Sequence, residues 1–371
     1  MKAVILVGGG GTRLRPLTYS MPKPMVPIVN RPFLEHMLTY MKRYGIDEVI
    51  LALCYLPDHI QSYFGDGSDH GIRLRYAIEE RPLGTAGAVK NVSDYIDDTF
   101  FVFNGDVFTD IDLNAMLELH QRESAKVTIA LTPVENPTIY GVVETETSGR
   151  VKRFIEKPGW DAVTTNMINA GVYVLDPEVM EQIPGDWFYM FEHGLFPSLL
   201  ESEEPIYGYG SNGYWIDIGT PEKYMNLNFD LLSGETSIMP PGKEHGGGIW
   251  LEEGVTIHPD AKVVGPVAIG RNSTIDAGVR ISGPSVIGPD CFIGAESYLK
   301  ETLVWQNVNV GREANLQGCV IADGVSIGDN SAVPRGCVLG QNVSIESNSA
   351  LSPETKAMPG ESLPSSEPTR S

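Results

Sequence analysis

A glycine-rich segment near the start of the chain carries residue types that could bind phosphate. It reads LVGGGGTRLRPLT over residues 6–18, and MPKP follows at residues 21–24. Glycine lets main-chain N–H groups approach phosphate oxygens closely, and the side chains of Arg13 and Lys23 can neutralise their charge. No Walker loop is present, nor a G-x-G-x-x-G followed by an acidic residue about 20 positions on. We therefore expect a phosphate-binding loop of a different kind.

Two aspartates follow predicted strands farther along the chain. Asp106 closes the sequence NGD after an apolar run, at the edge where open α/β sheets bind ligands. Asp217 lies in the sequence YWIDIGTPE, where a strand runs into a helix that Thr220 would cap and Pro221 would begin. An isolated aspartate at a strand end is more often a cap than a metal ligand, so neither position alone identifies a metal site.

The composition limits the possible partners and location. The formal net charge is −21, whereas nucleic acids and anionic membranes require a basic face, so we expect neither as a partner. The first acidic residue is Glu35, so the basic start of the chain could hold a small phosphorylated ligand. No long apolar run or export signal is found, and the four cysteines form no C-x-x-C pair. We expect reduced thiols and a cytoplasmic location.

The first two-thirds of the chain alternates short apolar runs with helical patterns. This alternation is typical of strand-helix-strand units and predicts an open, mainly parallel, Rossmann-like α/β sheet. The predicted strands cover residues 3–7, 48–53, 100–103, 127–131, 140–145 and 170–175, and the predicted helices cover residues 32–44 and 56–64. The glycine-rich segment and Asp106 both follow such strands, so the sheet must position them.

A period of six residues replaces this pattern from residue 251. Apart from two one-residue deletions, every sixth position is aliphatic, and all 18 such positions hold Ile, Leu or Val. They are Leu251, Ile257, Val263, Ile269, Ile275, Ile281, Ile287, Ile293, Leu299, Val304, Val310, Leu316, Ile321, Ile327, Val333, Leu339, Ile345 and Leu351. Glycine follows several of them, as at Gly270 and Gly288, where a tight corner needs a residue without a Cβ.

A six-residue period predicts a solenoid rather than a helix or a plain strand. It resembles the left-handed parallel β-helix, in which three hexapeptide repeats make one triangular coil, so we expect about six coils. The predicted organisation is a first domain at residues 1–235, a linker at 236–248, the β-helix at 249–356 and a mobile polar tail at 357–371.

The string GGxGTRLxPLT followed by PKP resembles the signature of the sugar-1-phosphate nucleotidylyltransferases, and further blocks in that family's order extend the resemblance over residues 1–235. It implies an enzyme that transfers a nucleoside monophosphate from a nucleoside triphosphate to a hexose 1-phosphate and releases pyrophosphate. The implied catalytic residues are Arg13, Lys23, Asp106 and Asp217. The resemblance also pairs the two aspartates as ligands of one Mg²⁺, which prefers a few carboxylates with phosphate oxygens and water.

The resemblance further assigns residues to the two substrates. The implied nucleotide-binding residues are Leu6, Gly8, Gly9, Gly11, Thr12, Glu79, Pro82, Gly84 and Thr85. The implied sugar-phosphate-binding residues are Gly141, Glu156, Lys157 and Asn169. Lys157 would hold the phosphate, Glu156 and Asn169 the hydroxyls, and Gly141 would let the main chain pass near the ring. By themselves, Glu156 and Lys157 could equally form a surface ion pair.

Glu79 bears on the choice of nucleobase. A carboxylate can accept hydrogen bonds from both N1–H and the N2 amine of guanine, whereas uracil and thymine offer one N3–H donor between two carbonyls. The residue therefore favours GTP. The alternative is that Glu79 is a solvated acid and that the main chain reads the base.

Catalysis with these parts needs no general base, because a sugar phosphate has a second pKa near 6 and is mostly dianionic at neutral pH. We expect positioning for in-line attack on the α-phosphorus, with charge stabilisation by Mg²⁺, Arg13, Lys23 and main-chain N–H groups. The best prediction for the product is GDP-mannose, as in mannose-1-phosphate guanylyltransferases. Glucose-1-phosphate thymidylyl-, uridylyl- and adenylyltransferases stay open, because mannose and glucose differ at one hydroxyl.

Two other functions make different demands on these residues. A non-catalytic regulatory subunit that binds nucleotide sugar predicts loss of Arg13, Lys23, Asp106 or Asp217, and all four are present. An acyltransferase site in the β-helix would need a deep histidine, and His258 in the first coil is the only histidine of the repeat. We expect the β-helix instead to assemble a homo-oligomer, since its end coils present flat faces.

Overall fold

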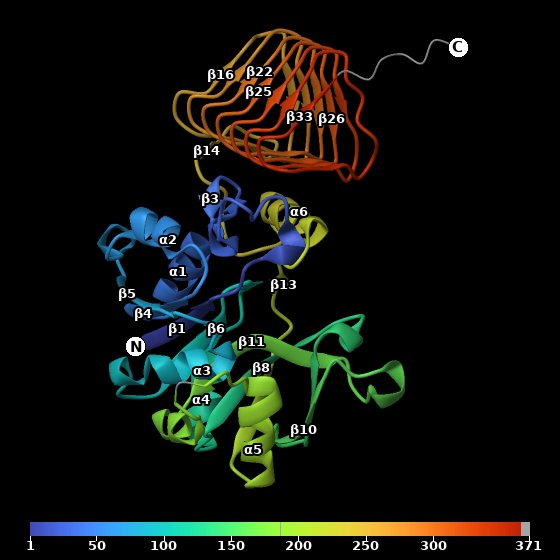
Figure 1. The fold of residues 1–371 in the computed structure, drawn as a ribbon. Helices are drawn as coiled ribbons and strands as arrows, with labels where there is room; N and C mark the ends of the chain where they lie inside the picture. The colour runs from blue at the N-terminus through green and yellow to red at the C-terminus, as the bar shows by residue number, and fades with distance from the viewer. Residues whose placement is uncertain (186, 365–371) are drawn as a thin grey trace. The chain divides into compact units, whose positions relative to one another are not determined.

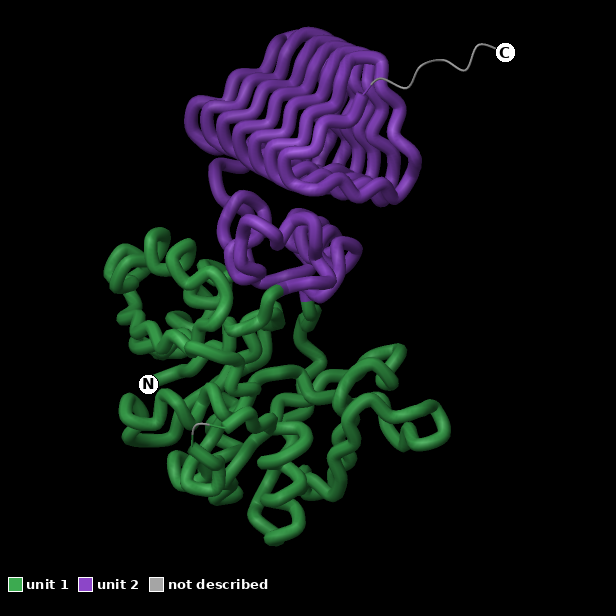
Figure 2. The backbone as a smooth tube through the Cα atoms, viewed as in Figure 1, with its two compact units in different colours: residues 1–10, 34–217 green, residues 11–33, 218–371 purple. Residues whose placement is uncertain are grey.

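The structure is a computed structural model that describes residues 1–185 and 187–364. The chain divides into two compact units (Figure 2). Unit 1 comprises Met1–Gly10 and Leu34–Asp217, and unit 2 comprises Gly11–Phe33 and Ile218–Ser371. This division differs from the predicted one, in which residues 1–235 form a single domain, because residues 11–33 and the helix after Asp217 bond to one another and to the solenoid.

Unit 1 is built on a nine-stranded sheet whose main path has the order β10-β9-β11-β6-β1-β4-β5 (Figure 1). The predicted open α/β sheet is confirmed. Strands β1, β4, β5 and β6 pair in parallel, and β11 pairs antiparallel with β6, β8 and β9. The strands are β1 (Lys2–Val7), β4 (Glu48–Leu53), β5 (Arg73–Ile78), β6 (Phe100–Asn104), β8 (Val127–Pro133), β9 (Gly141–Thr145), β10 (Val151–Glu156), β11 (Met167–Leu175) and β12 (Ile206–Gly210).

Helices of unit 1 follow the expected apolar periodicity. The predicted helix at residues 32–44 is α1 (Phe33–Arg43), and its apolar residues Leu34, Met37, Leu38 and Met41 are all buried. The others are α2 (Pro57–Phe64), α3 (Gly84–Asn91), α4 (Leu113–Arg122) and α5 (Phe196–Glu201). A second, two-stranded sheet pairs β7 (Val107–Thr109) with β13 (Trp215–Asp217).

Unit 2 begins with two short 3₁₀ turns, at Thr12–Leu14 and Lys23–Met25, and a hairpin of β2 (Pro27–Ile28) and β3 (Arg31–Pro32). After unit 1 the chain re-enters unit 2 as α6 (Pro221–Leu232). The predicted cap is confirmed, because the Thr220 side chain accepts a hydrogen bond from the Lys223 N–H at 3.3 Å. Pro221 occupies the first turn, where its missing N–H costs nothing.

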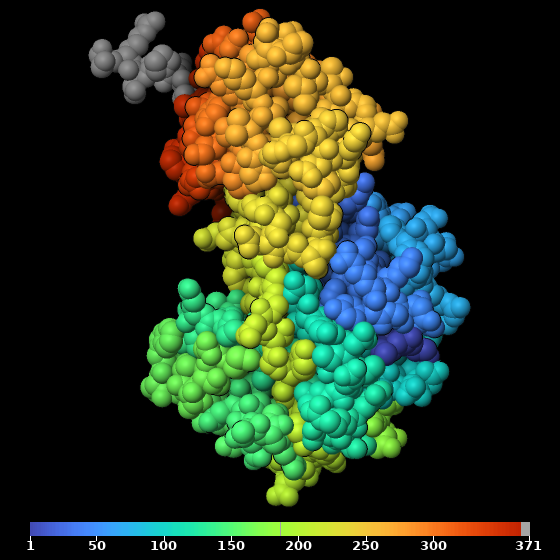
Figure 3. Space-filling model, turned by 180° about the vertical axis from the view of Figure 1, so that it is seen from behind, coloured from blue at the N-terminus to red at the C-terminus, as the bar shows by residue number. Residues whose placement is uncertain are grey.

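The solenoid of unit 2 consists of three sheets whose strands pair in parallel, apart from β14 at the start of the first sheet, which pairs antiparallel with β15 (Figure 1). In the parallel part, strands pair with the strand one coil later, as Ile269 does with Ile287. The colours of Figure 3 change steadily along the solenoid, because each coil lies against only the coils before and after it. The first sheet contains β14 (Lys243–Glu244), β15 (Ile249–Leu251), β18 (Val267–Ile269), β21 (Ser285–Ile287), β24 (Leu303–Val304), β27 (Val320–Ile321), β30 (Val338–Leu339) and β32 (Lys356–Ala357).

The remaining two sheets complete the triangle. One contains β16 (Thr256–Ile257), β19 (Thr274–Ile275), β22 (Phe292–Ile293), β25 (Asn309–Val310), β28 (Ser326–Ile327), β31 (Ser344–Ile345) and β33 (Ser362–Leu363). The other contains β17 (Lys262–Val264), β20 (Arg280–Ser282), β23 (Tyr298–Lys300), β26 (Asn315–Gln317) and β29 (Ala332–Val333).

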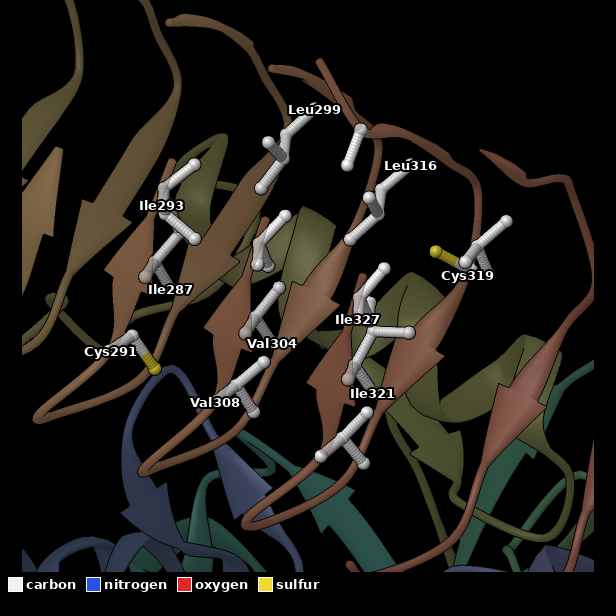
Figure 4. Close-up of a cluster of buried hydrophobic side chains, with 14 of the residues drawn as sticks. Ile287, Cys291, Ile293, Leu299, Val304, Val308, Leu316, Cys319, Ile321 and Ile327 are labelled. Atoms are coloured by element: carbon white, nitrogen blue, oxygen red, sulfur yellow. The ribbon is translucent and has the colours of Figure 1, made fainter. Parts of the chain in front are cut away.

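The predicted aliphatic positions form the interior of the solenoid. All 18 belong to one buried apolar cluster or pack against it. Figure 4 shows Ile287, Val304 and Ile321 on successive strands with their side chains inside. At Gly270 a Cβ would lie 2.5 Å from the main-chain nitrogen of Pro289, so the following coil leaves no room for a side chain. The close approach of that coil, rather than a positive φ, explains the glycine.

The solenoid continues past its predicted end at residue 356. Ala357 and Leu363 take the next two inward positions, and β32 and β33 pair with the preceding coil. The expected tail at 357–371 is therefore strand-forming up to Leu363, and residues 365–371 lie outside the described part. The sequence pattern missed this because an alanine fills the first of these positions. Within the described residues, no helix is long and apolar enough to cross a membrane.

Candidate active site

The pairing of β7 with β13 brings the main chain at the two predicted metal ligands to the same end of this strand pair in unit 1. Asp217 lies directly opposite Val107 in the antiparallel register, and Asp106 is the residue before Val107. The Asp217 side chain is only 8% exposed and accepts a 2.8 Å hydrogen bond from the Tyr140 hydroxyl. Two carboxylates at one end of a strand pair fit Mg²⁺, which takes its remaining ligands from phosphate and water.

Tyr140 and Trp215 connect these aspartates to the predicted sugar-binding residues. The rings of Tyr140 and Trp215 meet edge to face with centroids 5.4 Å apart. The indole N–H of Trp215 donates a 2.8 Å hydrogen bond to the carbonyl of Ala170 on β11. Sequence reasoning assigned no role to either aromatic residue. The only sequence feature that could have indicated a role is that Tyr140 directly precedes Gly141 and that Trp215 lies two residues before Asp217.

Gly141 and Glu156 face each other across β9 and β10. A Cβ at Gly141 would lie 2.8 Å from Oε2 of Glu156 and 2.7 Å from the Phe154 ring, so a larger residue would require these side chains to move. The ammonium group of Lys157 lies 3.2 Å from Oε1 of Glu156. The ion pair considered from the sequence is therefore present. The Lys157 side chain is 66% exposed, so it is accessible to a ligand as well.

Asn169 lies in a polar cluster on β11. Its amide nitrogen donates to the hydroxyl of Tyr173 at 2.9 Å, and its Oδ1 accepts from the N–H of Gly171 at 3.0 Å. Gly171 has a φ of 72°. A Cβ there would lie 2.7 Å from the amide nitrogen of Asn104, the residue at the end of β6. The cluster thus joins Asn169 to the strand that leads to Asp106.

The unit 1 part of the glycine-rich segment lies beside this strand end. Leu6 pairs with Asn104, and its carbonyl accepts a 2.9 Å hydrogen bond from the N–H of Gly105. A Cβ built on Gly8 would lie 3.9 Å from Oε2 of Glu79, which places these two predicted nucleotide contacts together. Gly9 is exposed and has no atom within 4 Å of such a Cβ.

Glu79 is buried rather than solvated, with 8% of its surface exposed. Its Oε2 accepts a 3.1 Å hydrogen bond from the N–H of Leu83. Burial raises the pKa of the Glu79 carboxyl above its ordinary value, and the Leu83 hydrogen bond opposes that rise. The Glu79 carboxylate is therefore not a solvated surface acid, and its role in reading the base stays a prediction.

The block after Glu79 forms the start of α3. Gly84 has a φ of 77°, and a Cβ there would lie 2.6 Å from the carbonyl of Tyr189. The hydroxyl of Thr85 accepts from the N–H of Phe191 at 2.8 Å and donates to Glu192 at 3.2 Å. Pro82 is exposed. Burial raises the pKa of Glu192, a half-buried acid that sequence reasoning did not identify.

Unit 2 carries the other predicted phosphate-binding residues, which are described by themselves. Gly11 has a φ of 58°, and its carbonyl accepts hydrogen bonds from the Thr18 hydroxyl at 2.8 Å and from the Leu14 N–H at 2.9 Å. Thr12 and Arg13 are exposed in the turn that follows. A Cβ at Gly11 would lie 3.2 Å from the Cβ of Lys23, so Lys23 lies beside this turn.

His258 does not have the environment of a catalytic base. Its side chain is 43% exposed, and its Nδ1 accepts a 3.1 Å hydrogen bond from the N–H of Asp260 two residues on. This is a local turn interaction on the first coil of the solenoid. It gives no support to acyltransferase chemistry at this position.

Comparison with protein families identifies both parts of the chain. Residues 2–234 match the model of the nucleotidyl transferase family. Residues 246–351 match the model of the LbH domain of the EIF2B epsilon subunit, in agreement with the predicted left-handed β-helix.

Several named proteins resemble the chain over most of its length. A mannose-1-phosphate guanylyltransferase of Mycobacterium tuberculosis is 41% identical over 283 residues, which cover 76% of this chain and 78% of the relative. A UTP–glucose-1-phosphate uridylyltransferase of Synechocystis is 35% identical over 332 residues, which cover 85% of this chain and 86% of the relative.

Among solved structures, HddC from Yersinia pseudotuberculosis in complex with GMP-PN is similar, with a TM-score of 0.54 and 32% sequence identity. The match covers 61% of this chain and 97% of HddC.

Proposed function

Since the chain belongs to the nucleotidyl transferase family and is a sugar-1-phosphate nucleotidyltransferase, we propose that it transfers GMP from GTP to mannose 1-phosphate and releases pyrophosphate. The observation that supports this proposal is the β7–β13 pairing, which brings the main chain at Asp106 close to Asp217, while a hydrogen bond from Tyr140 links Asp217 to the predicted sugar-binding strands. A metal-assisted transfer between two phosphorylated substrates needs this proximity.

The choice of guanine rests on Glu79. A buried carboxylate beside Gly8 can accept hydrogen bonds from both N1–H and the N2 amine of guanine. The Mycobacterium tuberculosis relative bears a guanylyltransferase name, which agrees with this proposal. The name of the Synechocystis relative favours the second candidate, UTP with glucose 1-phosphate.

Mannose 1-phosphate would bind along β9, β10 and β11. Glu156 and Asn169 would hydrogen-bond its hydroxyls, and Gly141, which lies opposite Glu156, would let the main chain pass near the ring. The exposed ammonium group of Lys157 would bind the phosphate, and its ion pair with Glu156 would weaken as it does so.

Asp106 and Asp217 are the residues that would hold a Mg²⁺ ion. Such an ion neutralises phosphate charge and orients the triphosphate. Arg13 and Lys23 would stabilise the charge that develops on the α-phosphate and the departing pyrophosphate. The sugar phosphate supplies its own dianionic nucleophile, so no side chain has to remove a proton.

The solenoid would also serve in assembly of the enzyme. We propose that it joins subunits into a homo-oligomer, because stacked coils end in flat faces with unpaired strand edges.

Pyrophosphate release tests the proposed function. The purified protein is assayed with Mg²⁺ and each of GTP, UTP, dTTP and ATP, in turn with mannose 1-phosphate and glucose 1-phosphate. Turnover with GTP and mannose 1-phosphate supports the proposal. Turnover restricted to UTP and glucose 1-phosphate would favour the second candidate, and absence of turnover with every pair would favour a regulatory subunit.

A further inference from the structure

A chain of hydrogen bonds within unit 2 runs from the solenoid to the hairpin of β2 and β3. The indole N–H of Trp305, in the solenoid, donates to the hydroxyl of Tyr224 on α6 at 2.9 Å. That hydroxyl in turn donates to the carbonyl of Pro27 at 2.5 Å. Trp305 is 4% exposed and Tyr224 1% exposed. Burial raises the pKa of Tyr224 well above its ordinary value, so its hydroxyl keeps the proton that it donates.

The tip of the same hairpin has a strained main chain. Val29 has a φ of 42° and Asn30 a φ of 66°. A β-branched residue rarely adopts the left-handed region, and it does so where surrounding contacts compensate for the strain. Here the N–H of Val29 donates to the Asn228 side chain on α6 at 2.8 Å. The side-chain amide of Asn30 donates to the carbonyl of Ile287 in the solenoid at 3.0 Å.

An ion pair adds a second direct link to the solenoid. The guanidinium group of Arg31 lies 3.4 Å from Oε1 of Glu252, whose side chain is 8% exposed. The Oε2 of Glu252 accepts from the N–H of Arg271 at 3.1 Å, which fixes the carboxylate to the next coil. The hairpin is thus held by α6 on one side and by two solenoid residues, Ile287 and Glu252, on the other.

The hairpin is continuous with the phosphate-binding residues of unit 2. The N–H of Val26 donates to the carbonyl of Lys23 at 3.2 Å, and the N–H of Phe33 closes the hairpin on the carbonyl of Val26 at 3.0 Å. Lys23 also lies beside Gly11, at the start of the turn that carries Arg13. Fixing the hairpin therefore fixes the main chain that precedes it.

We propose that the solenoid acts on catalysis through this network, with Trp305, Tyr224 and Asn228 as positioning residues that hold the segment carrying Arg13 and Lys23. The inference rests on the proposed function, in which Arg13 and Lys23 bind the triphosphate. None of the three positioning residues is among the predicted substrate-binding residues. They act by restricting the hairpin to the one conformation in which Lys23 is correctly placed.

Loss of one link has a defined kinetic consequence. Tyr224→Phe removes one hydroxyl and both of its hydrogen bonds, and Trp305→Phe removes the indole donor. We expect either change to lower kcat/KM for GTP about tenfold, which corresponds to about 1.4 kcal/mol, with a raised KM for GTP. The KM for mannose 1-phosphate should stay within about twofold, because its predicted ligands lie in unit 1. A variant that merely unfolds in part lowers kcat and leaves both KM values unchanged.

The test compares wild type, Tyr224→Phe, Trp305→Phe and the double variant. Trp250→Phe, in the first coil of the solenoid, is the matched control for loss of an indole. Steady-state kinetics are measured for each full-length protein, and hydrogen exchange of peptides covering residues 23–33 and residues 100–109 is followed by mass spectrometry. A shared network predicts that the double variant is little worse than Tyr224→Phe alone, because both changes break the same chain of bonds.

The expected result is faster exchange in residues 23–33, unchanged exchange in residues 100–109, and a higher KM for GTP in both single variants but not in Trp250→Phe. Unchanged exchange in residues 23–33, or additive effects in the double variant, would overturn the inference. If the wild type releases no pyrophosphate with any substrate pair, the proposed function fails. Faster exchange confined to residues 23–33 would even then support the structural link.

Discussion

The hydroxyl of Tyr140 donates a hydrogen bond of 2.8 Å to Oδ1 of Asp217. Tyr140 immediately precedes Gly141 of β9, and its carbonyl accepts a 3.0 Å hydrogen bond from the N–H of Lys157. One residue thus connects a predicted metal ligand to two predicted sugar-phosphate contacts. This relationship leads to the first prediction.

Replacement of Tyr140 by phenylalanine should slow catalysis without unfolding the protein. The ring would keep its contact with Trp215, whereas Asp217 would lose one donor and turn more freely. Loss of a hydrogen bond to a charged group costs about 1.5–3 kcal/mol, so we expect kcat to fall roughly ten- to a hundredfold. The Mg²⁺ concentration for half-maximal activity should rise. An unchanged magnesium requirement would show that Tyr140 does not position Asp217.

We expect Asp106→Asn and Asp217→Asn each to lower Mg²⁺-dependent turnover by roughly a thousandfold or more. The reason is that an amide cannot supply the negative charge that a divalent cation needs. Asp98→Asn is the control, since Asp98 lies on the surface of the same unit. Turnover is measured against Mg²⁺ concentration, with thermal unfolding as a check on folding. Near-normal activity of either site variant with Mg²⁺ would rule out the aspartate pair as the metal site.

Apolar periodicity in the sequence predicts some elements of the fold and misses others. The β1 strand, α1 and the solenoid follow from apolar periodicity, because burial of one face dictates which positions are apolar. Strand β5 was missed, since the exposed Arg73 and Arg75 interrupt its apolar pattern. The last coil was also missed, because its first inward position is filled by Ala357 rather than by Ile, Leu or Val.

Contacts between distant parts of the chain could not be predicted. Val29 meets Asn228 across 199 residues, and Asn30 meets Ile287 across 257 residues. Local periodicity in the sequence contains no information about such pairs, so it did not indicate that residues 11–33 group with α6 and the solenoid. The role of Tyr140 was missed because an aromatic residue at the start of a strand is more often part of the core.

Glu79→Gln should change the choice of purine nucleotide. Inosine lacks the N2 amine of guanosine, so wild type should prefer GTP over ITP in kcat/KM by roughly tenfold or more if the carboxylate accepts from that amine. Glutamine would keep one acceptor oxygen and add a donor that faces the base. We expect the preference to shrink to about twofold, whereas Glu80→Gln, at an exposed neighbouring position, should leave it unchanged. Equal use of GTP and ITP by wild type would contradict the assigned role.

The pH dependence of GTP use should report the same carboxylate. Burial raises the pKa of Glu79 above its ordinary value, and only the ionised form accepts two hydrogen bonds from guanine. Activity with GTP should therefore fall as the pH drops through this raised pKa and be fully present above it. The ratio of wild-type to Glu79→Gln kcat/KM removes the ionisation of the substrates, which both enzymes share. A ratio that stays constant from pH 8 down to about pH 5 would exclude a titrating Glu79 at the base.

The central claim is best tested by competition among substrates in one reaction. Equal concentrations of GTP, UTP, dTTP and ATP, with equal mannose 1-phosphate and glucose 1-phosphate, are incubated with the protein and Mg²⁺, and the nucleotide sugars formed early are separated and identified by mass. The initial product ratios give the ratios of kcat/KM directly. We predict GDP-mannose as the dominant product. UDP-glucose as the dominant product would contradict both the assigned base and the assigned sugar.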